Sequence, residues 1–292
     1  MALKNLGHEI IGACEIDKHA RQIYGNHFPD VPIHPDATKI NPNDLPDFDL
    51  LVAGFPCQPF SVAGVKRGFE DTRGTLFFEI ARITQEKRPR YLLLENVKGI
   101  LSHDGGETGR KIIRTLDELG YDVQAGIVNT KNFLPQNRER AFFVGTLRGD
   151  PRPQIFPLKR EDSETSPRAE VTPTKITPVL TPERIPRRLN GRRFKEEGDE
   201  AFTLTTLDRH GIMIKKISNC IRVGGRGSLD RHTWDVINDG VRIRLITPIE
   251  CERLQGFPDN WTESVSERQR YICLGNAVSV PVVQNIISKL LE

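Results

Sequence analysis

Short apolar runs alternate with stretches of helical periodicity over the first half of the chain. The apolar runs predict strands at about 9–14, 49–53, 91–94, 123–128 and 141–145. The helical stretches lie between them, at about 18–27, 75–87 and 107–119. This alternation predicts an α/β fold, with a doubly wound and mostly parallel sheet covered by helices on both faces. Ligands of such sheets bind at the carboxyl ends of the strands, so a functional site is expected there.

The pattern changes near residue 150. Eight of the 20 prolines lie between Pro151 and Pro186, where the apolar periodicity disappears, and this indicates a linker or an irregular domain edge. Residues 200–243 are rich in glycine and contain short apolar runs, which is typical of a small β-rich domain. Helical periodicity returns at Thr247, where Thr-Pro-Ile-Glu forms a capping box, and a last helix is expected at about 280–291.

The composition is that of a soluble globular protein, with 37% hydrophobic and 28% charged residues. The formal net charge of +3 permits nucleic-acid binding without requiring it. Five cysteines stand without CxxC spacing, which indicates neither a zinc cage nor a disulfide framework and fits a reducing cytoplasm. The sequence has no apolar run of about 18 residues and no signal-peptide pattern. We therefore expect a cytoplasmic protein with no bound metal and no membrane contact.

A cysteine stands in a rigid loop directly after the second predicted strand. Cys57 lies between Pro56 and Pro59, in the segment 54–61. Pro56 restricts the local backbone, and the loop presents the thiol where a ligand of the sheet would bind. A free cysteine is more often buried and inert. The loop position and the rigid flanks favour a nucleophile instead.

Charged groups stand at two further strand ends. Glu95 ends the next apolar strand, so in a parallel sheet its carboxylate would share a cleft with the Cys57 thiol. Arg138 and Arg140 alternate just before the last predicted strand, so they would face the same side if this segment is extended. Guanidinium groups suit carbonyl and phosphate oxygens. Each of these features, taken singly, is also compatible with an ordinary surface charge or a helix cap.

Taken in order, these segments resemble the motifs of bacterial DNA (cytosine-5)-methyltransferases. The matching segments are ACEID, FPCQPFS, GTLFFEI, ENV, QNRER, RLITPIECERLQGFPDNW and GNAV. The resemblance covers about 15–150 and 244–292. It implies a Rossmann-like catalytic and cofactor-binding domain at 1–155, a smaller inserted β-rich target-recognition domain with its linker at 156–243, and a segment at 244–292 that returns to the catalytic domain.

The resemblance implies a reaction on cytosine in DNA. Cys57 would attack carbon 6 of a cytosine flipped out of the duplex, while Glu95 would hydrogen-bond the ring nitrogen and the exocyclic amine. Carbon 5 would then take the methyl group of S-adenosylmethionine, the implied cofactor, without a metal ion. Arg140 would contact the base carbonyl, and Arg138 would support the site.

The resemblance also assigns binding residues. Those on the cofactor side are Glu15 for the ribose hydroxyls, Ile16 for the adenine ring and Asp36 for the adenine amine, with Ala37, Pro56, Leu76 and Asn276. The candidates for DNA contact are Gln58, Ser61, Thr205, Thr206, Arg222, Arg226 and Arg231. The implied partners are double-stranded DNA and a cognate restriction endonuclease of a restriction-modification system. A solitary or phage enzyme is equally compatible with the residues.

One motif of the family is not found. Family members begin with a strand and a turn of the type F-x-G-x-G-G, whereas residues 1–7 resemble the end of the helix that follows that turn, with Gly7 as its stop. The strand would lie in the middle of the sheet, and its absence would leave two unpaired edges. Three explanations are open: a start site assigned too late, a split enzyme completed by a second chain, and a decayed gene.

Two other functions stay open. A tRNA cytosine-5 methyltransferase would share the fold and the Pro-Cys and ENV motifs, although the long inserted region favours DNA. A non-catalytic DNA-binding remnant would bind DNA with an affinity that falls steeply with salt, and it would transfer no methyl group.

Overall fold

The computed structural model describes residues 1–56, 76–158, 176–180, 210–215 and 241–291. Eight predicted site residues lie outside this part of the chain: Cys57, Gln58, Ser61, Thr205, Thr206, Arg222, Arg226 and Arg231. The chain divides into two compact units. Unit 1 comprises Met1–Asn129, Glu139–Lys159 and Val280–Glu292, and unit 2 comprises Thr130–Arg138 and Arg160–Ser279. The predicted division into 1–155, 156–243 and 244–292 stays a prediction.

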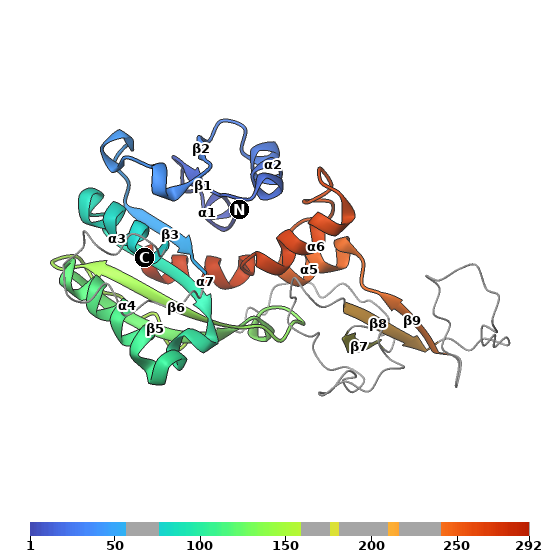
Figure 1. The fold of residues 1–292 in the computed structure, drawn as a ribbon. Coiled ribbons are helices and arrows are strands. Elements are labelled where there is room, and N and C mark those ends of the chain that lie inside the picture. Colours follow the sequence, from blue (N-terminus) through green and yellow to red (C-terminus); the bar gives the residue numbers. More distant parts are fainter. Residues whose placement is uncertain (57–75, 159–175, 181–209, 216–240, 292) are drawn as a thin grey trace. The chain divides into compact units, whose positions relative to one another are not determined.

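A four-stranded sheet forms the centre of unit 1 (Figure 1). Its strands, in spatial order, are β3 (Leu50–Gly54), β4 (Tyr91–Val97), β6 (Glu139–Leu147) and β5 (Tyr121–Asn129). β3 and β4 are parallel, but β6 runs antiparallel to both of its neighbours. The sheet is therefore mixed, where the sequence predicted a mostly parallel one. Only nine residues join β5 to β6, too few for the crossover that a parallel pair would need.

The remaining strands of unit 1 form a separate small sheet. β1 (Ala13–Cys14) and β2 (Ile33–His34) pair in parallel, joined by α2 (Lys18–His27), whose first turn is capped by the Asp17 carboxylate. Within the described residues, β3 pairs with β4 and with no strand on its other edge. Val52, in the middle of β3, is 45% exposed. The described residues contain no strand that pairs with both of these sheets.

Two helices cover one face of the four-stranded sheet. α3 (Leu76–Lys87) and α4 (Glu107–Glu118) bury Phe77 and Ile112 against Leu92, Leu94 and their neighbours. The adjacent β4 residues alternate to the opposite face, which therefore carries Glu95. Elsewhere in the unit, α7 (Val280–Leu291) buries one apolar side and contacts α1 (Ala2–Asn5). Short 3₁₀ helices occupy connecting segments at Ala37–Lys39, Pro42–Asp44, Lys98–Leu101 and His103–Gly106.

Unit 2 combines a small antiparallel sheet with two helices. The sheet has the order β7 (Ile176–Leu180), β8 (His210–Lys215) and β9 (Val241–Leu245). α5 (Pro248–Gln255) begins at the predicted capping box, in which Thr247 and Glu250 each accept the other's backbone N–H. α6 (Glu267–Asn276) follows, and a 3₁₀ helix at Thr130–Asn132 opens the loop that belongs to this unit.

A buried carboxylate holds the connection between α5 and α6. Glu252 is fully buried and accepts hydrogen bonds from the backbone N–H groups of Asn260 at 2.7 Å and Thr262 at 2.8 Å. The Arg270 guanidinium lies 2.9 Å from the same carboxylate, and its side chain is only 15% exposed. The charge of Glu252 is thus compensated by a cation and by backbone donors, as a buried charge requires.

We expect Glu252→Ala to lower the free energy of unfolding by about 3 kcal/mol or more, because it leaves the Arg270 charge buried without its partner. Arg253→Ala is the matched control on the same helix, since Arg253 pairs with Asp259 in solvent. It should change the stability by less than about 1 kcal/mol. Denaturant titration of both variants measures the difference. Equal losses would contradict the role of the buried carboxylate.

Candidate active site

The carboxyl ends of β3 and β4 lie side by side, and Cys57, which lies outside the described residues, follows β3 in the sequence. The register pairs Gly54 at the end of β3 with Glu95 on β4. Phe55 and Pro56 continue from β3 and are the last described residues before Cys57. A Cβ atom on Gly54 would lie 3.4 Å from Oε2 of Glu95. Glycine at this position therefore keeps space open beside the carboxylate.

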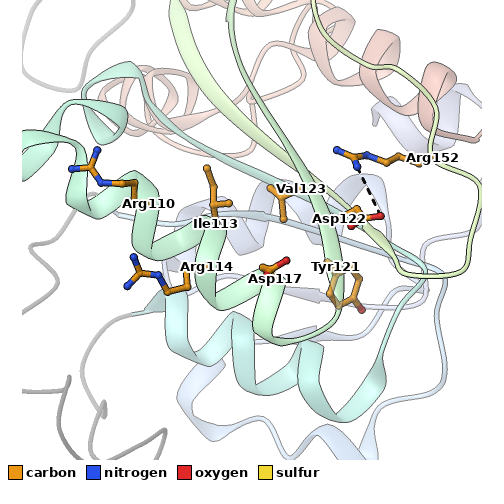
Figure 2. A pocket seen from close by; sticks show the side chains of 8 residues that line it. All are labelled: Arg110, Ile113, Arg114, Asp117, Tyr121, Asp122, Val123 and Arg152. Carbon is orange, nitrogen blue, oxygen red and sulfur yellow. Dashed lines mark ion pairs between the residues drawn. The ribbon is translucent and has the colours of Figure 1, made fainter.

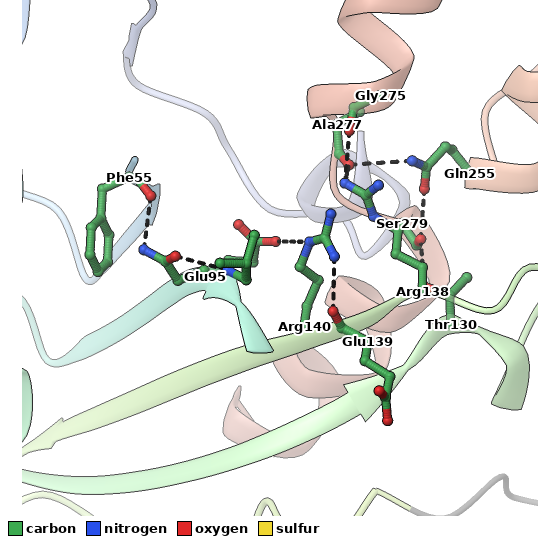
Figure 3. A network of polar contacts seen from close by, with 12 residues as sticks. Phe55, Glu95, Thr130, Arg138, Glu139, Arg140, Gln255, Gly275, Ala277 and Ser279 are labelled. Carbon is green, nitrogen blue, oxygen red and sulfur yellow. Dashed lines mark hydrogen bonds and ion pairs between the residues drawn. The ribbon is translucent and has the colours of Figure 1, made fainter. Parts of the chain in front are cut away.

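Asn96 fastens the start of the Cys57 loop to β4. Its Nδ2 donates to the carbonyl of Phe55 at 2.9 Å, and its Oδ1 accepts from the N–H of Val97 at 2.8 Å (Figure 3). The side chain is 2% exposed, so water does not compete for these bonds. Sequence reasoning assigned no role to Asn96. A polar residue at the end of an otherwise apolar strand was the signal that could have found it.

Glu95 is held by an arginine from the neighbouring antiparallel strand. Nε of Arg140 lies 3.0 Å from Oε1 of Glu95, and each side chain is 16% exposed. Arg140 pairs with Val97 across β4 and β6, so it lies on the same face of the sheet as Glu95, two residues earlier. Burial lowers the pKa of the Arg140 guanidinium, and the nearby Glu95 carboxylate acts in the opposite direction. The result is an acceptor and a cationic donor side by side, near the carboxyl end of β4.

Arg138, two residues earlier, has a different environment. It lies in unit 2, is 2% exposed, and donates from Nη2 to the carbonyls of Gly275 at 3.0 Å and Ala277 at 2.8 Å (Figure 3). These carbonyls belong to the carboxyl end of α6, where the partial negative charge of the helix dipole also attracts the Arg138 guanidinium. The geometry of Arg138 fits the expected supporting role, through backbone carbonyls.

Three of the predicted cofactor residues, Glu15, Ile16 and Asp36, follow the ends of β1 and β2. Glu15 and Asp36 both lie close enough to the Cys14 thiol to raise its pKa, although burial is the larger cause. Oε1 of Glu15 accepts from the N–H of Asp17 at 2.8 Å, and Asp36 accepts from the N–H of Thr38 at 2.9 Å. Ile16, which follows Glu15 in the sequence, is 73% exposed. Exposed apolar surface beside two carboxylates fits a nucleoside with ribose hydroxyls.

The other predicted cofactor residues are spread over the described part of the chain. Ala37 opens the 3₁₀ helix after Asp36, and Leu76 begins α3 and is 40% exposed. Pro56 is exposed at the end of β3, and Asn276 is exposed at the end of α6 in unit 2. Across the described ranges, no three His, Cys, Asp or Glu side chains are grouped as metal ligands.

A separate surface hollow in unit 1 lies at the other end of the sheet (Figure 2). It is lined by the start of β5, including Tyr121, and by α4. Tyr121 pairs with Leu147, whereas the end of β6 that carries Arg140 pairs with the last residues of β5. Exposed ion pairs line the hollow, as in the contact of Arg152 with Asp122 at 3.9 Å. The hollow is therefore remote from the Glu95–Arg140 pair.

Known proteins resemble this chain in sequence over nearly all of its length. All 292 residues match the family model of the C-5 cytosine-specific DNA methylases. Type II methyltransferase M1.ScrFI of Lactococcus lactis subsp. cremoris is 40% identical, over 95% of this chain and 71% of that protein. Type II methyltransferase M.HpaII of Haemophilus parainfluenzae is 38% identical, over 100% of this chain and 86% of that protein.

Solved structures share the fold at low sequence identity. The S. pombe Dnmt2 methyltransferase superposes with a TM-score of 0.67 at 20% identity, covering 99% of this chain and 93% of that one. The Entamoeba histolytica methyltransferase EhMeth gives 0.60 at 17% identity, covering 96% and 88%. The methyltransferase fold expected from the sequence is thereby confirmed.

We expect Asn96→Ala to lower the free energy of unfolding by about 1–3 kcal/mol, because it leaves the buried Phe55 carbonyl without its donor. Asn43→Ala is the control, since Asn43 is exposed, and it should cost no more than about 0.5 kcal/mol. Denaturant titration compares the two variants. If Asn96→Ala were as mild as the control, the tether between β4 and the Cys57 loop would be refuted.

Proposed function

Because the chain belongs to the C-5 cytosine-specific DNA methylase family, we propose that it methylates carbon 5 of a flipped-out cytosine in a specific DNA sequence, through a covalent Cys57 adduct. The enzyme class, DNA cytosine-5 methyltransferase, follows from the family and from the bacterial type II relatives. The Glu95–Arg140 pair beside the Cys57 loop is the observation that carries the proposal. The reaction steps, the contacts to the cofactor and the contacts to the cytosine base are proposed in addition to this enzyme class.

Carbon 5 of cytosine is a poor nucleophile, and covalent addition at carbon 6 removes this difficulty. The Cys57 thiolate forms a bond to carbon 6, and the displaced electron pair makes carbon 5 electron-rich. S-adenosylmethionine, when bound, supplies the methyl group as an electrophile on its sulfonium. Removal of the carbon-5 hydrogen by a base then lets the thiolate leave and restores the ring.

Glu95 and Arg140 suit the edge of a cytosine ring. That edge presents an amine donor, a ring nitrogen and a carbonyl acceptor in a row. A carboxyl group at Glu95 would face the amine and the ring nitrogen, and the Arg140 guanidinium would donate to the carbonyl. The 3.0 Å contact between the two side chains already sets acceptor and donor side by side. A preorganised pair of this kind needs little rearrangement when charge develops on the ring.

The proposal also assigns residues of this chain to the binding of S-adenosylmethionine. We propose that Glu15 binds the ribose hydroxyls and that Ile16 packs on the adenine, since a bare apolar side chain beside a carboxylate fits both needs. Asp36 would accept from the adenine amine. Ala37, Pro56, Leu76 and Asn276 complete the proposed set, which uses no metal ion.

The DNA side of the proposal rests on the family. Flipping the target cytosine out of the duplex costs a few kcal/mol, so contacts to the DNA must offset that cost. Gln58 and Ser61 are the proposed contacts near the Cys57 loop. The proposed contacts in the inserted recognition domain, residues 156–243, are Thr205, Thr206, Arg222, Arg226 and Arg231. A cognate restriction endonuclease and a cytoplasmic location complete the proposal.

The deciding experiment measures methyl transfer from labelled S-adenosylmethionine to mixed-sequence duplex DNA, with tRNA as the second acceptor. We expect transfer to DNA, and a drop of at least about 10³-fold for Cys57→Ala, since this change removes the covalent nucleophile. Duplex DNA containing 5-fluorocytosine should form a stable adduct with the parent chain and none with the variant.

Two results would contradict the proposal. Preferential labelling of tRNA would make the chain a tRNA methyltransferase. Salt-dependent DNA binding without transfer or adduct, in every form of the protein tested, would make it a binding remnant.

The open edge of β3 leads to a second proposal about the complete enzyme. The backbone N–H of Tyr91 on β4 donates to the carbonyl of Asp49 at 2.9 Å. Backbone polar groups alternate between the two edges of a strand, so those of Leu51 and Ala53 also point toward β4. The N–H and carbonyl groups of Val52 then point to the side where the described residues contain no strand. We propose that a further strand pairs there, supplied by residues encoded upstream of Met1 or by a second chain.

Proline at position 52 tests this strand. Val52→Pro removes an N–H group that makes no bond to β4, so we expect the β3–β4 ladder to survive and strand addition to fail. Transfer is measured for the 292-residue chain alone, for the chain extended by upstream residues, and for the chain co-expressed with neighbouring genes. The arm that gains activity identifies the source, and Val52→Pro should abolish the gain while Val52→Thr preserves it. Full activity of the 292-residue chain alone, unchanged by Val52→Pro, would refute the added strand.

A further inference from the structure

A chain of buried hydrogen bonds surrounds the end of α6 in unit 2 (Figure 3). Gln255, the last residue of α5, is fully buried. Its Nε2 donates to the carbonyl of Leu274 at 2.9 Å and to that of Ala277 at 3.4 Å. Its Oε1 accepts from the hydroxyl of Ser279 at 2.7 Å. One amide side chain therefore binds the turn after α6 on both sides.

The network continues into the loop that precedes β6. The Ser279 hydroxyl lies 2.8 Å from the hydroxyl of Thr130, and the N–H of Thr130 donates to the carbonyl of Arg138 at 2.9 Å. Arg138 itself donates to the carbonyls of Gly275 and Ala277. Thr130 and Ser279 are 3% and 2% exposed, so these bonds are shielded from water. The carbonyls at a helix end normally lack partners, and here protein side chains supply them.

Asn276 stands in the middle of this buried network and is itself exposed. The residues before and after it in the turn, Gly275 and Ala277, have their carbonyls held by Arg138 and Gln255. Asn276 is the only exposed residue between Leu274 and Val280. The network thus fixes the backbone on both sides of a side chain that is left available to a ligand.

We propose that Gln255 is a positioning residue for S-adenosylmethionine, acting through the turn that presents Asn276. The inference rests on the proposed function, in which Asn276 contacts the cofactor. Gln255 touches no ligand itself. By ordering the turn before the ligand arrives, it removes an entropic cost that binding would otherwise carry.

A double-mutant cycle between Gln255 and Asn276 tests the coupling. The probe is S-adenosylhomocysteine, and its affinity is measured by calorimetry on the active form of the full chain. We expect Gln255→Leu to weaken binding about tenfold, since three buried hydrogen bonds are lost at similar side-chain volume. In an Asn276→Ala background the same change should cost less than about twofold, because the contact that it orders is gone. In methyl transfer, the KM for the cofactor should rise while kcat stays unchanged.

Two further variants keep the test informative. Ser279→Ala removes a single hydroxyl of the network, so it should fold normally and weaken binding by about threefold. Glu252→Ala, on the same helix, destabilises unit 2 through the α5–α6 connection and serves as the control for stability alone. It should leave the probe's affinity unchanged at temperatures where the protein is folded.

Several outcomes would overturn the proposal. Losses at Gln255 and Asn276 that multiply would show that the two residues act independently. The same weakening in Glu252→Ala would attribute the effect to stability, and a lower kcat at constant KM would place it in the chemical step. If the unsubstituted chain methylates DNA but Asn276→Ala binds the probe normally, this inference fails and the proposed function stands. If the unsubstituted chain binds no probe, the proposed function fails first.

Discussion

The structure of the candidate site depends on the register of β4 between two strands of opposite direction. Parallel pairing with β3 brings Gly54 beside Glu95, and antiparallel pairing with β6 brings Arg140 to Glu95. A shift of either register by one residue would turn the side chains to the opposite face of the sheet. The first four residues of β4 are completely buried, so such a shift would expose a core strand. Core packing therefore fixes the relative positions of Glu95, Arg140 and the carboxyl end of β3.

Buried polar groups satisfy one another in three separate sets, two in unit 1 and one in unit 2. Asn96 binds the backbone before Cys57, Glu95 pairs with Arg140, and Gln255 binds the turn around Asn276. Leaving any of these groups without a partner costs about 1–3 kcal/mol, which is a large share of the stability of a domain. The same contacts that stabilise the fold thus keep functional side chains in one geometry, and precise placement is what catalysis requires.

The sequence predicted the elements and the strand ends well, for an identifiable reason. Periodicity is a local property, so α2, α3 and α7 and the capping box at Thr247 were found close to their observed bounds. The resemblance to the family likewise assigned Glu95 and Arg140 to one site, and the structure places them in contact. Strand direction was wrong for β6, because pairing depends on the length of the connection and not on the strand's own residues. The partners of Asn96, Arg138 and Gln255 depend on tertiary contacts, and Cys57 itself lies outside the described residues.

The proposed cofactor-binding and base-binding residues of unit 1 lie on two separate ladders. The proposed cofactor residues Glu15 and Asp36 belong to the β1–β2 ladder, and the base-binding residues belong to the β3–β4–β6 ladder. Within the described residues, no strand is hydrogen-bonded to both ladders. Edge N–H groups in water carry little cost, so such a sheet can fold. Methyl transfer, however, needs the donor and the base held within a few tenths of an ångström, and loops joining two separate ladders hold them less firmly than a shared strand does. The strand proposed at Val52 would connect the two ladders if it also pairs with β1 or β2, and its main effect would then be on catalysis more than on folding.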